Sequence, residues 1–134
     1  MKYLFMLLCC VVAVSPLHAE EKRGKAEYNG AHLKFEESEC NFGEILRREE
    51  NKSCTFRFVN DGSEPLVILS ATTSCSCLKT EFSRKPIAVG ETGEIKVILE
   101  SKKVDKGILR RIVQIRSNSV GGIDILTIKG VAKD

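Results

Sequence analysis

The sequence has no tryptophan, two methionines and two histidines, and these shortages exclude several kinds of site. Both methionines and His18 lie within the first 18 residues, so His32 is the only imidazole in the rest of the chain. No Ser/His/Asp set, pair of catalytic carboxylates or phosphate-binding loop is recognisable. We therefore predict that the protein is not an enzyme and needs no cofactor.

The sequence also lacks an apolar run long enough to cross a bilayer. The longest run, residues 4–14, has eleven residues, whereas a spanning helix needs about 20. Lys2 precedes this run, and residues 15–19 resemble a cleavage region, with Ala19 at −1 and the bulky Leu17 at −3. We predict a signal peptide over residues 1–19, no transmembrane helix, and export to the periplasm, the cell surface or the medium.

Two cysteines within the apolar run allow an alternative to simple cleavage. A lipid could be attached to Cys9 or Cys10, as in a lipoprotein. The residues before them, Leu7 and Leu8, are not the small residues that lipid attachment normally requires. We interpret both cysteines as apolar residues of the signal peptide, and the lipid anchor stays open as the alternative.

The exported part of the chain carries little net charge. Removing residues 1–19 takes away only Lys2, which leaves 20 − 18 = +2. There is no basic stripe with interleaved aromatic residues, so we expect no nucleic-acid partner. Residues 20–30 are charged and show no periodicity, which predicts a mobile lead-in before a domain over residues 31–134.

The sequence lacks the i, i+3, i+4 apolar spacing of amphipathic helices and alternates with period two instead. An all-β protein with seven or eight short strands of this kind is typical of an antiparallel immunoglobulin-like β-sandwich, with an eight-stranded barrel as the competing architecture. The antibody-type Cys…Trp…Cys signature is excluded, because there is no tryptophan. The expected strands cover residues 31–36, 40–45, 53–59, the first half of 66–78, 78–82, 95–99, 108–117 and 123–131.

Cys40 and Cys54 fall on the inward faces of their predicted strands, where cysteine usually acts as a small hydrophobic residue. A hairpin centred near Glu49 would place Cys40 opposite Phe58 and Cys54 opposite Glu44, so a direct bridge would need a different register. Two unpaired thiols would nevertheless be unusual in an exported protein. With the two cysteines of the Cys-x-Cys pair, four thiols allow three complete pairings, and the sequence does not choose among them.

Cys75 and Cys77 form the only dense group of side-chain chemistry. In a flat strand their Cα atoms would lie about 6.6 Å apart, at the far edge of disulfide geometry, so a bridge between them needs a local turn and would be easily reduced. Two thiolates could instead bind Cu(I) or Zn(II), but zinc sites want four ligands. A third interpretation is that Cys75 and Cys77 have only a structural role at the end of the strand.

A series of short motifs is spread in order over residues 39–131. The motifs are Phe42-Gly43-Glu44-Ile45, 55–62, 65–68, Ser74-Cys75-Ser76-Cys77-Leu78, 86–95, Ser117-Asn118 and 128–131. In this order they resemble a bacterial family of short exported domains, domain of unknown function family 1573, which is similar to Hydin-type and pilus-chaperone-like immunoglobulin folds. The resemblance implies fold and export, and it implies no activity.

The family's hallmark, Ser-Cys-Gly-Cys-Thr, falls on residues 74–78 with two departures. Ser76 stands where glycine is usual, and Leu78 stands where threonine is usual. A third departure is Val89, where a proline would precede Gly90. Because serine rarely adopts a positive φ, Ser76 predicts that the turn here does not require one.

We predict an exported, non-catalytic immunoglobulin-like module of the bacterial cell envelope, either structural or binding a protein or glycan. The alternative is metal or thiol-redox handling through Cys75 and Cys77, with Ser74, Ser76 and Leu78 as motif neighbours. The basic pairs Lys102-Lys103 and Arg110-Arg111 are interpreted as solvated faces.

Overall fold

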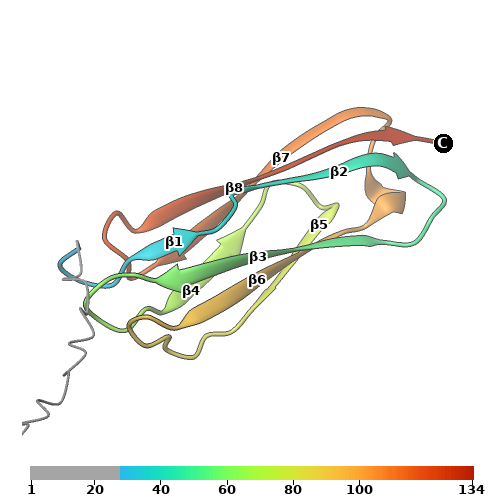
Figure 1. Ribbon diagram of the computed structural model, residues 1–134. Helices are drawn as coiled ribbons and strands as arrows, with labels where there is room; N and C mark the ends of the chain where they lie inside the picture. Colours follow the sequence, from blue (N-terminus) through green and yellow to red (C-terminus); the bar gives the residue numbers. More distant parts are fainter. Residues whose placement is uncertain (1–27) are drawn as a thin grey trace, which may run out of the picture.

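The computed structural model describes residues 28–134, so the predicted signal peptide and residues 20–27 of the lead-in lie outside the described residues. Eight strands and one short 3-10 turn make up most of this part of the chain (Figure 1). They are β1 (Leu33–Phe35), β2 (Glu39–Leu46), β3 (Lys52–Asn60), β4 (Ile68–Thr72), β5 (Leu78–Phe82), β6 (Thr92–Leu99), η1 (Ser101–Lys103), β7 (Gly107–Ser117) and β8 (Ile123–Lys133).

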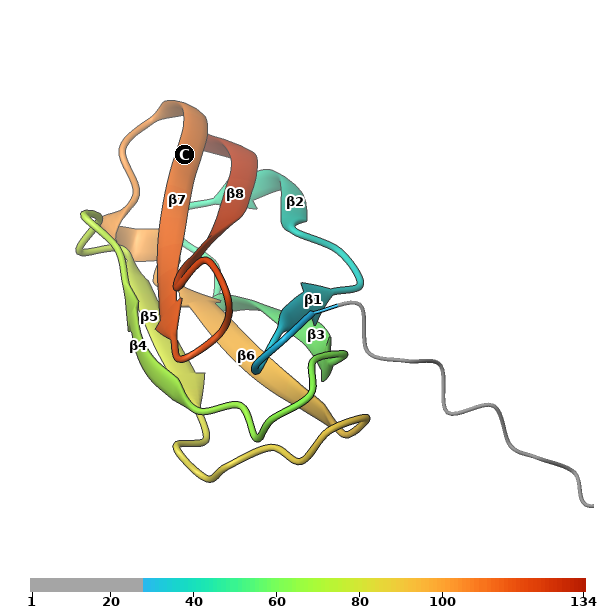
Figure 2. The same cartoon turned by 90° about the vertical axis from the view of Figure 1, so that its left-hand side faces the viewer.

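The strands form two four-stranded sheets that pack face to face (Figure 2). One sheet has the order β1-β3-β6-β5 and the other has the order β2-β8-β7-β4. All pairs are antiparallel except β2 and β8, which run parallel. Two separate sheets confirm the predicted immunoglobulin-like sandwich over the closed barrel.

Strict alternation places the core between the sheets. On β3, Phe56 and Phe58 point inward and are 3% and 2% exposed. The facing positions of the other sheet are also apolar, so each sheet covers the other's apolar face, which is the main stabilising contribution to such a fold. The fully buried aliphatic side chains are Ile45, Leu66, Ile68, Ile95, Val97, Leu99, Val113, Ile115, Leu126 and Ile128.

β2 contains the irregularity that its glycine predicts. Its register with β8 shifts between Asn41 and Glu44, and Gly43 between them has φ of 65°. Only glycine adopts this left-handed conformation without steric cost. The bulge turns the strand so that both Cys40 before it and Ile45 after it face the core.

The turn after β3 is organised by one buried polar side chain. Asn60 is 0% exposed, and its Oδ1 accepts hydrogen bonds from the backbone N–H groups of His32 and Gly62 at 3.3 and 3.1 Å. Its Nδ2 donates to the carbonyl oxygens of Glu64 and Ile87 at 2.8 and 3.0 Å. The side chain therefore ties its own turn to the segments at His32 and Ile87, and its polar atoms are satisfied as burial requires.

The predicted hairpin between residues 40–45 and 53–59 is wrong. β2 pairs with β8, and β3 pairs with β1 and β6, so the charged segment around Glu49 crosses from one sheet to the other. Alternation gives the face that a strand buries but not the sheet to which it belongs. The two strands bury Ile45 and Phe56 against the same core from opposite sides.

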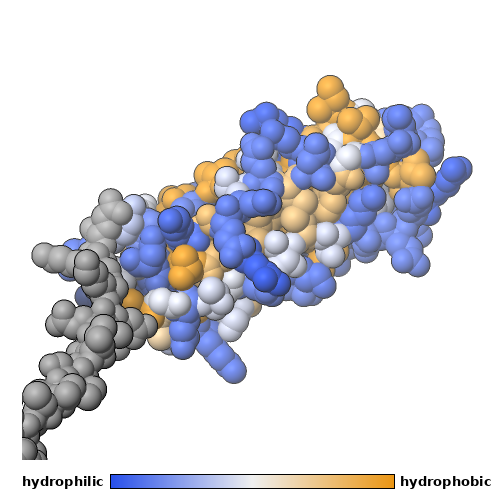
Figure 3. Space-filling view, viewed as in Figure 1, coloured by the Kyte–Doolittle hydropathy of each residue, from blue (hydrophilic) through white to orange (hydrophobic). Residues whose placement is uncertain are grey.

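The outer face of the β2-β8-β7-β4 sheet carries exposed apolar side chains, of which Ile108 is 87% exposed. The others on β7 and β8 are Ile112, Ile123, Ile125 and Val131. Figure 3 shows apolar surface along the β7 side of the molecule, interrupted by hydrophilic residues. Ile112 lies on the outward face of β7, opposite to the buried side chains of the same strand. Within residues 28–134, no helix has the length and apolar character that crossing a membrane requires.

Candidate functional site

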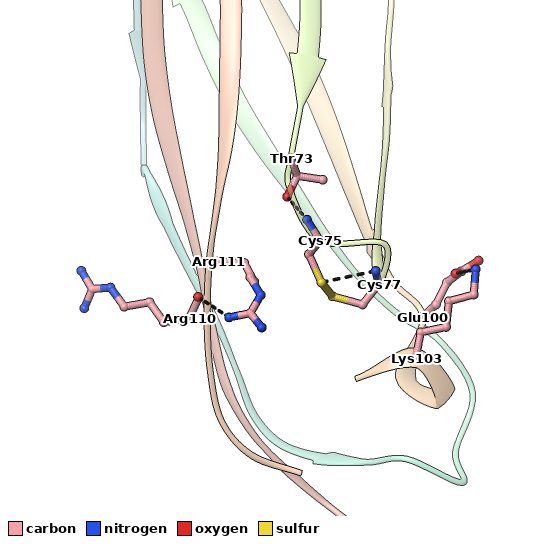
Figure 4. Close-up of a disulfide and its surroundings, with 7 residues drawn as sticks. All are labelled: Thr73, Cys75, Cys77, Glu100, Lys103, Arg110 and Arg111. Carbon is pink, nitrogen blue, oxygen red and sulfur yellow. Dashed lines mark hydrogen bonds and ion pairs between the residues drawn. A yellow bond between two sulfur atoms is a disulfide. The ribbon is translucent and has the colours of Figure 1, made fainter. Parts of the chain in front are cut away.

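The Cys-x-Cys segment lies in the loop between β4 and β5, at one end of the sandwich (Figure 4). Cys75 and Cys77 are joined by a disulfide, with their Cα atoms 5.2 Å apart. The backbone N–H of Leu78 donates to the carbonyl of Cys75 at 3.3 Å, which closes a turn around Ser76 and Cys77. The predicted local turn is therefore present, and it shortens the separation expected in a flat strand.

This turn needs no glycine. No non-glycine residue among the described ones has a positive φ, so Ser76 sits in an ordinary conformation, as its identity predicted. Leu78, the second departure from the hallmark, is buried at the start of β5 opposite Leu99 of β6. The apolar side chain at this position joins the loop to the core.

Hydrogen bonds to neighbouring residues hold the backbone of both cysteines. The N–H of Cys75 donates to Oγ1 of Thr73 at 3.3 Å, and the N–H of Glu100 donates to the carbonyl of Cys77 at 2.7 Å. Cys77 is 1% exposed, whereas Cys75 is half-buried. One sulfur thus faces the core, and the other lies near the surface.

A hollow of about 600 Å³ lies beside the more exposed sulfur. Charged side chains dominate its far wall, and hydroxyl groups of the loop form its near wall. It is lined by Ser74, Cys75, Ser76, Lys103, Asp105, Arg110, Arg111 and Ile112. The site therefore brings together a polar loop, a disulfide and more positive than negative charge.

Arg111 is the cation that faces the disulfide. In Figure 4 its side chain lies on the disulfide side of β7, while the side chain of Arg110 points away. Arg111 is half-buried, and its Nη1 donates to the carbonyl of Arg110 at 2.9 Å. Lys103 of η1 lines the same hollow and pairs with Glu100.

Sequence reasoning placed Cys75, Cys77, Ser74, Ser76 and Leu78 in one segment, and the structure brings Arg111 to them. The interpretation of both arginines as a solvated face holds for Arg110, which is exposed, and fails for Arg111. The alternation of β7 could have indicated this, because Arg111 lies at one of its inward-facing positions. Two adjacent arginines suggest a single exposed face instead, although neighbours on a strand point to opposite sides.

The metal hypothesis depends on the oxidation state of the two sulfurs. In the disulfide they are not thiolates, which are the forms that bind soft metals. Among residues 28–134, no group of three or more His, Cys, Asp or Glu side chains could hold a metal ion. His32 pairs with Asp61 at the opposite end of the sandwich. A metal at Cys75 and Cys77 therefore requires prior reduction and, for zinc, further ligands.

Fold and site together define a class, an immunoglobulin-like sandwich module with a disulfide-closed loop at one end. The chain belongs to the family described as "Protein of unknown function (DUF1573)", whose sequence model matches residues 33–132. This match confirms the resemblance drawn from the ordered motifs. No curated protein matches the sequence.

Three solved structures are similar in fold. A protein of unknown function from Porphyromonas gingivalis W83 aligns with 80% of this chain and 49% of its own, at 16% identity and a TM-score of 0.64. PapD-like domain 7 of human CEP192 aligns with 78% of this chain and 87% of its own, at 5% identity and a TM-score of 0.63. The secreted serine protease VesC from Vibrio cholerae aligns with 77% of this chain, at 12% identity and a TM-score of 0.56.

These likenesses show the fold alone, because the identities are low. The chain spans about half the length of the Porphyromonas gingivalis protein and 23% of the length of VesC. One fold can support many functions, so the function of this chain has to be argued from its own site.

Proposed function

We propose that this protein is an exported, non-catalytic binding module of the bacterial cell envelope, and that it contacts its partner through the end of the sandwich that carries the Cys75–Cys77 disulfide. Export is supported by the apolar segment and cleavage region within residues 1–19. The single observation that carries the choice of surface is the hollow beside the disulfide, with Arg111 facing it.

The disulfide makes this loop suitable for recognition. It joins two residues across a turn whose backbone is held by Thr73 and Glu100. A loop that is fixed before binding loses little conformational entropy when a partner docks, so more of the contact energy appears as affinity. Ser74 and Ser76 are exposed on this loop and offer hydroxyl groups for hydrogen bonds.

The charges around the hollow indicate the chemistry of the partner. Lys103, Arg110 and Arg111 outnumber Asp105, and a guanidinium binds carboxylates in a two-pronged geometry. The partner is therefore an envelope protein segment or a glycan that presents carboxylate groups. Half-burial of Arg111 strengthens this contact relative to a fully solvated charge.

Matched arginine variants test this function. The purified protein is immobilised, envelope extract is passed over it, and bound material is quantified for wild type, Arg111→Gln and Arg116→Gln. A charged hydrogen bond contributes about 1.5–3 kcal/mol, so Arg111→Gln should reduce retention of the partner by roughly tenfold or more. Arg116→Gln should have little effect, because Arg116 is an exposed arginine of β7 that does not line the hollow. Recovery of no partner, or equal retention by the two variants, would contradict the proposal.

A second candidate function is thiol–disulfide exchange at the same pair. It is favoured by the position of Cys75 near the surface beside Arg111 and Lys103, because nearby cations stabilise the thiolate that forms on reduction. The reduction potential of the pair and the rate of reaction with a reduced dithiol test it. Titration of the reduced protein with Cu(I) and Zn(II) tests the metal alternative. A pair that stays unreactive to reductant and, once reduced, binds neither metal would eliminate both.

A further inference from the structure

β7 extends well beyond the strand that pairs with one of its two edges. β8 pairs with β7 from Gly107 to Arg116, whereas β4 pairs with it only from Gln114 to Ser117. Figure 2 shows β7 continuing past the end of β4, whose chain turns away toward β5. Residues 107–113 of β7 therefore have a neighbouring strand on one side only.

The backbone groups at this open edge follow from the hydrogen bonds at the end of the strand. Successive residues of a strand direct their N–H and C=O groups to opposite edges. The N–H of Ser117 donates to the carbonyl of Gly122, on the β8 side, and the N–H of Asn118 donates to the carbonyl of Val67, on the β4 side. β7 pairs with β8 without a register shift, so its even-numbered residues face the open edge. These residues are Ile108, Arg110 and Ile112.

Of the backbone groups at this edge, only the carbonyl of Arg110 has a hydrogen-bond partner within residues 28–134. Its partner is Nη1 of Arg111, at 2.9 Å. A side chain thus occupies the place from which a neighbouring strand would donate an N–H group. Unpaired edge groups of this kind are a template for another strand.

The space beside this edge is the hollow at the disulfide. Arg110, Arg111 and Ile112 line it from β7, and residues 74–76 line it from the disulfide loop. Figure 4 shows the side chain of Arg111 reaching from β7 toward the disulfide. Because these β7 residues directly precede the stretch that pairs with β4, the hollow continues the line of β4 along β7.

We propose that an extended segment of the partner adds to this open edge of β7, in line with β4 and, like β4, antiparallel to β7. The inference rests on the proposed function and narrows its partner from a protein segment or a glycan to a protein strand. In this mode of recognition, main-chain hydrogen bonds supply affinity and alternate side chains supply specificity.

The side chains of the edge define the sequence of the added strand. Ile108 and Ile112 are 87% and 50% exposed on the outer face, and Arg110 between them is exposed. Arg110 forms no ion pair within residues 28–134. Directly opposed residues of paired strands share a face and contact each other. The partner strand therefore carries an acidic residue between two apolar ones at alternate positions.

The same charge argues against a second copy of this chain at the edge. Antiparallel pairing of two such edges, centred on Arg110, would place the two Arg110 side chains opposite each other. Like charges directly opposite destabilise a sheet. A carboxylate at that position is complementary instead.

Hydrogen exchange at single amides, followed by NMR, tests the added strand. The probe is the end-blocked peptide Ser-Val-Thr-Glu-Thr-Val-Ser, mixed with the purified protein. At about ten times the Kd of the peptide, the amides of Ile108, Arg110 and Ile112 should exchange roughly tenfold more slowly. The amides of Leu109 and Arg111 face β8 and should not change.

N-methylated peptides separate backbone pairing from side-chain contact. A methyl group on the glutamate nitrogen removes the donor to the carbonyl of Arg110 and should weaken binding by roughly tenfold. A methyl group on a threonine nitrogen faces away from β7 and should leave binding unchanged.

A reciprocal charge exchange tests the register. Arg110→Glu should bind this peptide roughly tenfold more weakly and should prefer the peptide with lysine in place of glutamate. The control is Arg116→Glu, because β4 covers the edge at Arg116 through Ser70. This variant should bind both peptides as wild type does.

Three results would each overturn strand addition: no binding of the peptide, equal binding after methylation of the glutamate nitrogen, or no preference for the even-numbered amides. The retention assay with envelope extract and Arg111→Gln tests the proposed function separately. A partner retained there without protection of the even-numbered amides would overturn the added strand and leave the binding surface in place.

Discussion

The backbone N–H of Cys77 donates a hydrogen bond at 3.3 Å to the Sγ of Cys75, the sulfur to which Cys77 is also covalently joined. This contact holds the Cys75 sulfur close to the backbone of Cys77. It leaves Cys77 buried and Cys75 near the surface beside Arg111. The bridge therefore belongs both to the core, through Cys77, and to the surface hollow, through Cys75.

The division between core and site predicts different costs for two truncations. Phe56→Ala removes a buried ring and leaves a cavity between the sheets, so it should cost about 3–5 kcal/mol of the roughly 5–15 kcal/mol of a typical domain. Cys75→Ala/Cys77→Ala opens a very short loop and should cost roughly 1–2 kcal/mol. Denaturant unfolding curves measure both. If the double cysteine variant unfolds while Phe56→Ala is tolerated, the assignment of core and site is reversed.

Asn60 should be essential for the turn after β3. Asn60→Ala removes four hydrogen bonds and takes the side-chain partner away from the N–H groups of His32 and Gly62 and from the Glu64 carbonyl, which should cost roughly 3–4 kcal/mol. The control is Asn41→Ala, because Asn41 is exposed and accepts one hydrogen bond, from the N–H of Gly43. It should cost about 0.5–1 kcal/mol. Similar unfolding midpoints for the two variants would show that the buried amide is not the organising group.

Stability should depend on pH through Glu100. Hydrogen bonds from Lys103 and Lys79 lower the pKa of its carboxyl group below the ordinary value of 4.5. The folded state thus binds the proton less tightly than the unfolded state, and the contribution is present above pH 4.5 and disappears as the pH falls through the lowered pKa. Glu100→Gln should be less stable than wild type at pH 7, and the gap should close in acid.

Urea midpoints measured from pH 7 to pH 2 test this dependence. Glu64→Gln is the control, because Glu64 is exposed and its side chain forms no ion pair among the described residues. It should track wild type at every pH. A gap between Glu100→Gln and wild type that is the same at pH 7 and pH 2 would show that the charge of this carboxylate does not contribute.

Export predicts a defined mature protein. The intact mass of the protein recovered from the cell envelope or medium should correspond to a chain that begins at Glu20 and carries no lipid. A mass that includes a lipid on Cys9 or Cys10 would replace cleavage at Ala19 with the lipoprotein alternative. Recovery of the full-length chain from the cytoplasm alone would contradict export.

The strands and their buried faces could be predicted from the alternation of apolar and polar residues along the chain. Period two fixes which face of a strand is buried, and Phe56, Phe58, Val97, Leu126 and Ile128 occupy the alternate apolar positions of their strands and are buried. The sheet to which each strand belongs was not predictable in the same way. Pairing of β2 with β8 joins residues far apart in sequence, and no local pattern encodes such a pairing.

The candidate site was predictable only in its local part. Two cysteines separated by one residue require a turn before they can be joined, and this followed from strand geometry alone. The approach of Arg111 from β7 depends on how the sheets stack. Side chains that meet across the sandwich leave no spacing signal in the sequence.

Photo-crosslinking in living cells tests the contact surface most directly. A benzophenone amino acid is placed at Ser76, on the disulfide loop, or at Lys85, an exposed residue of the loop between β5 and β6. Both positions are solvent-facing, so the variants should fold alike, and irradiated envelopes are analysed for adducts of higher mass. We predict a discrete, saturable adduct from Ser76 and none from Lys85; adducts from Lys85 alone, or from neither position, would contradict binding through the disulfide end.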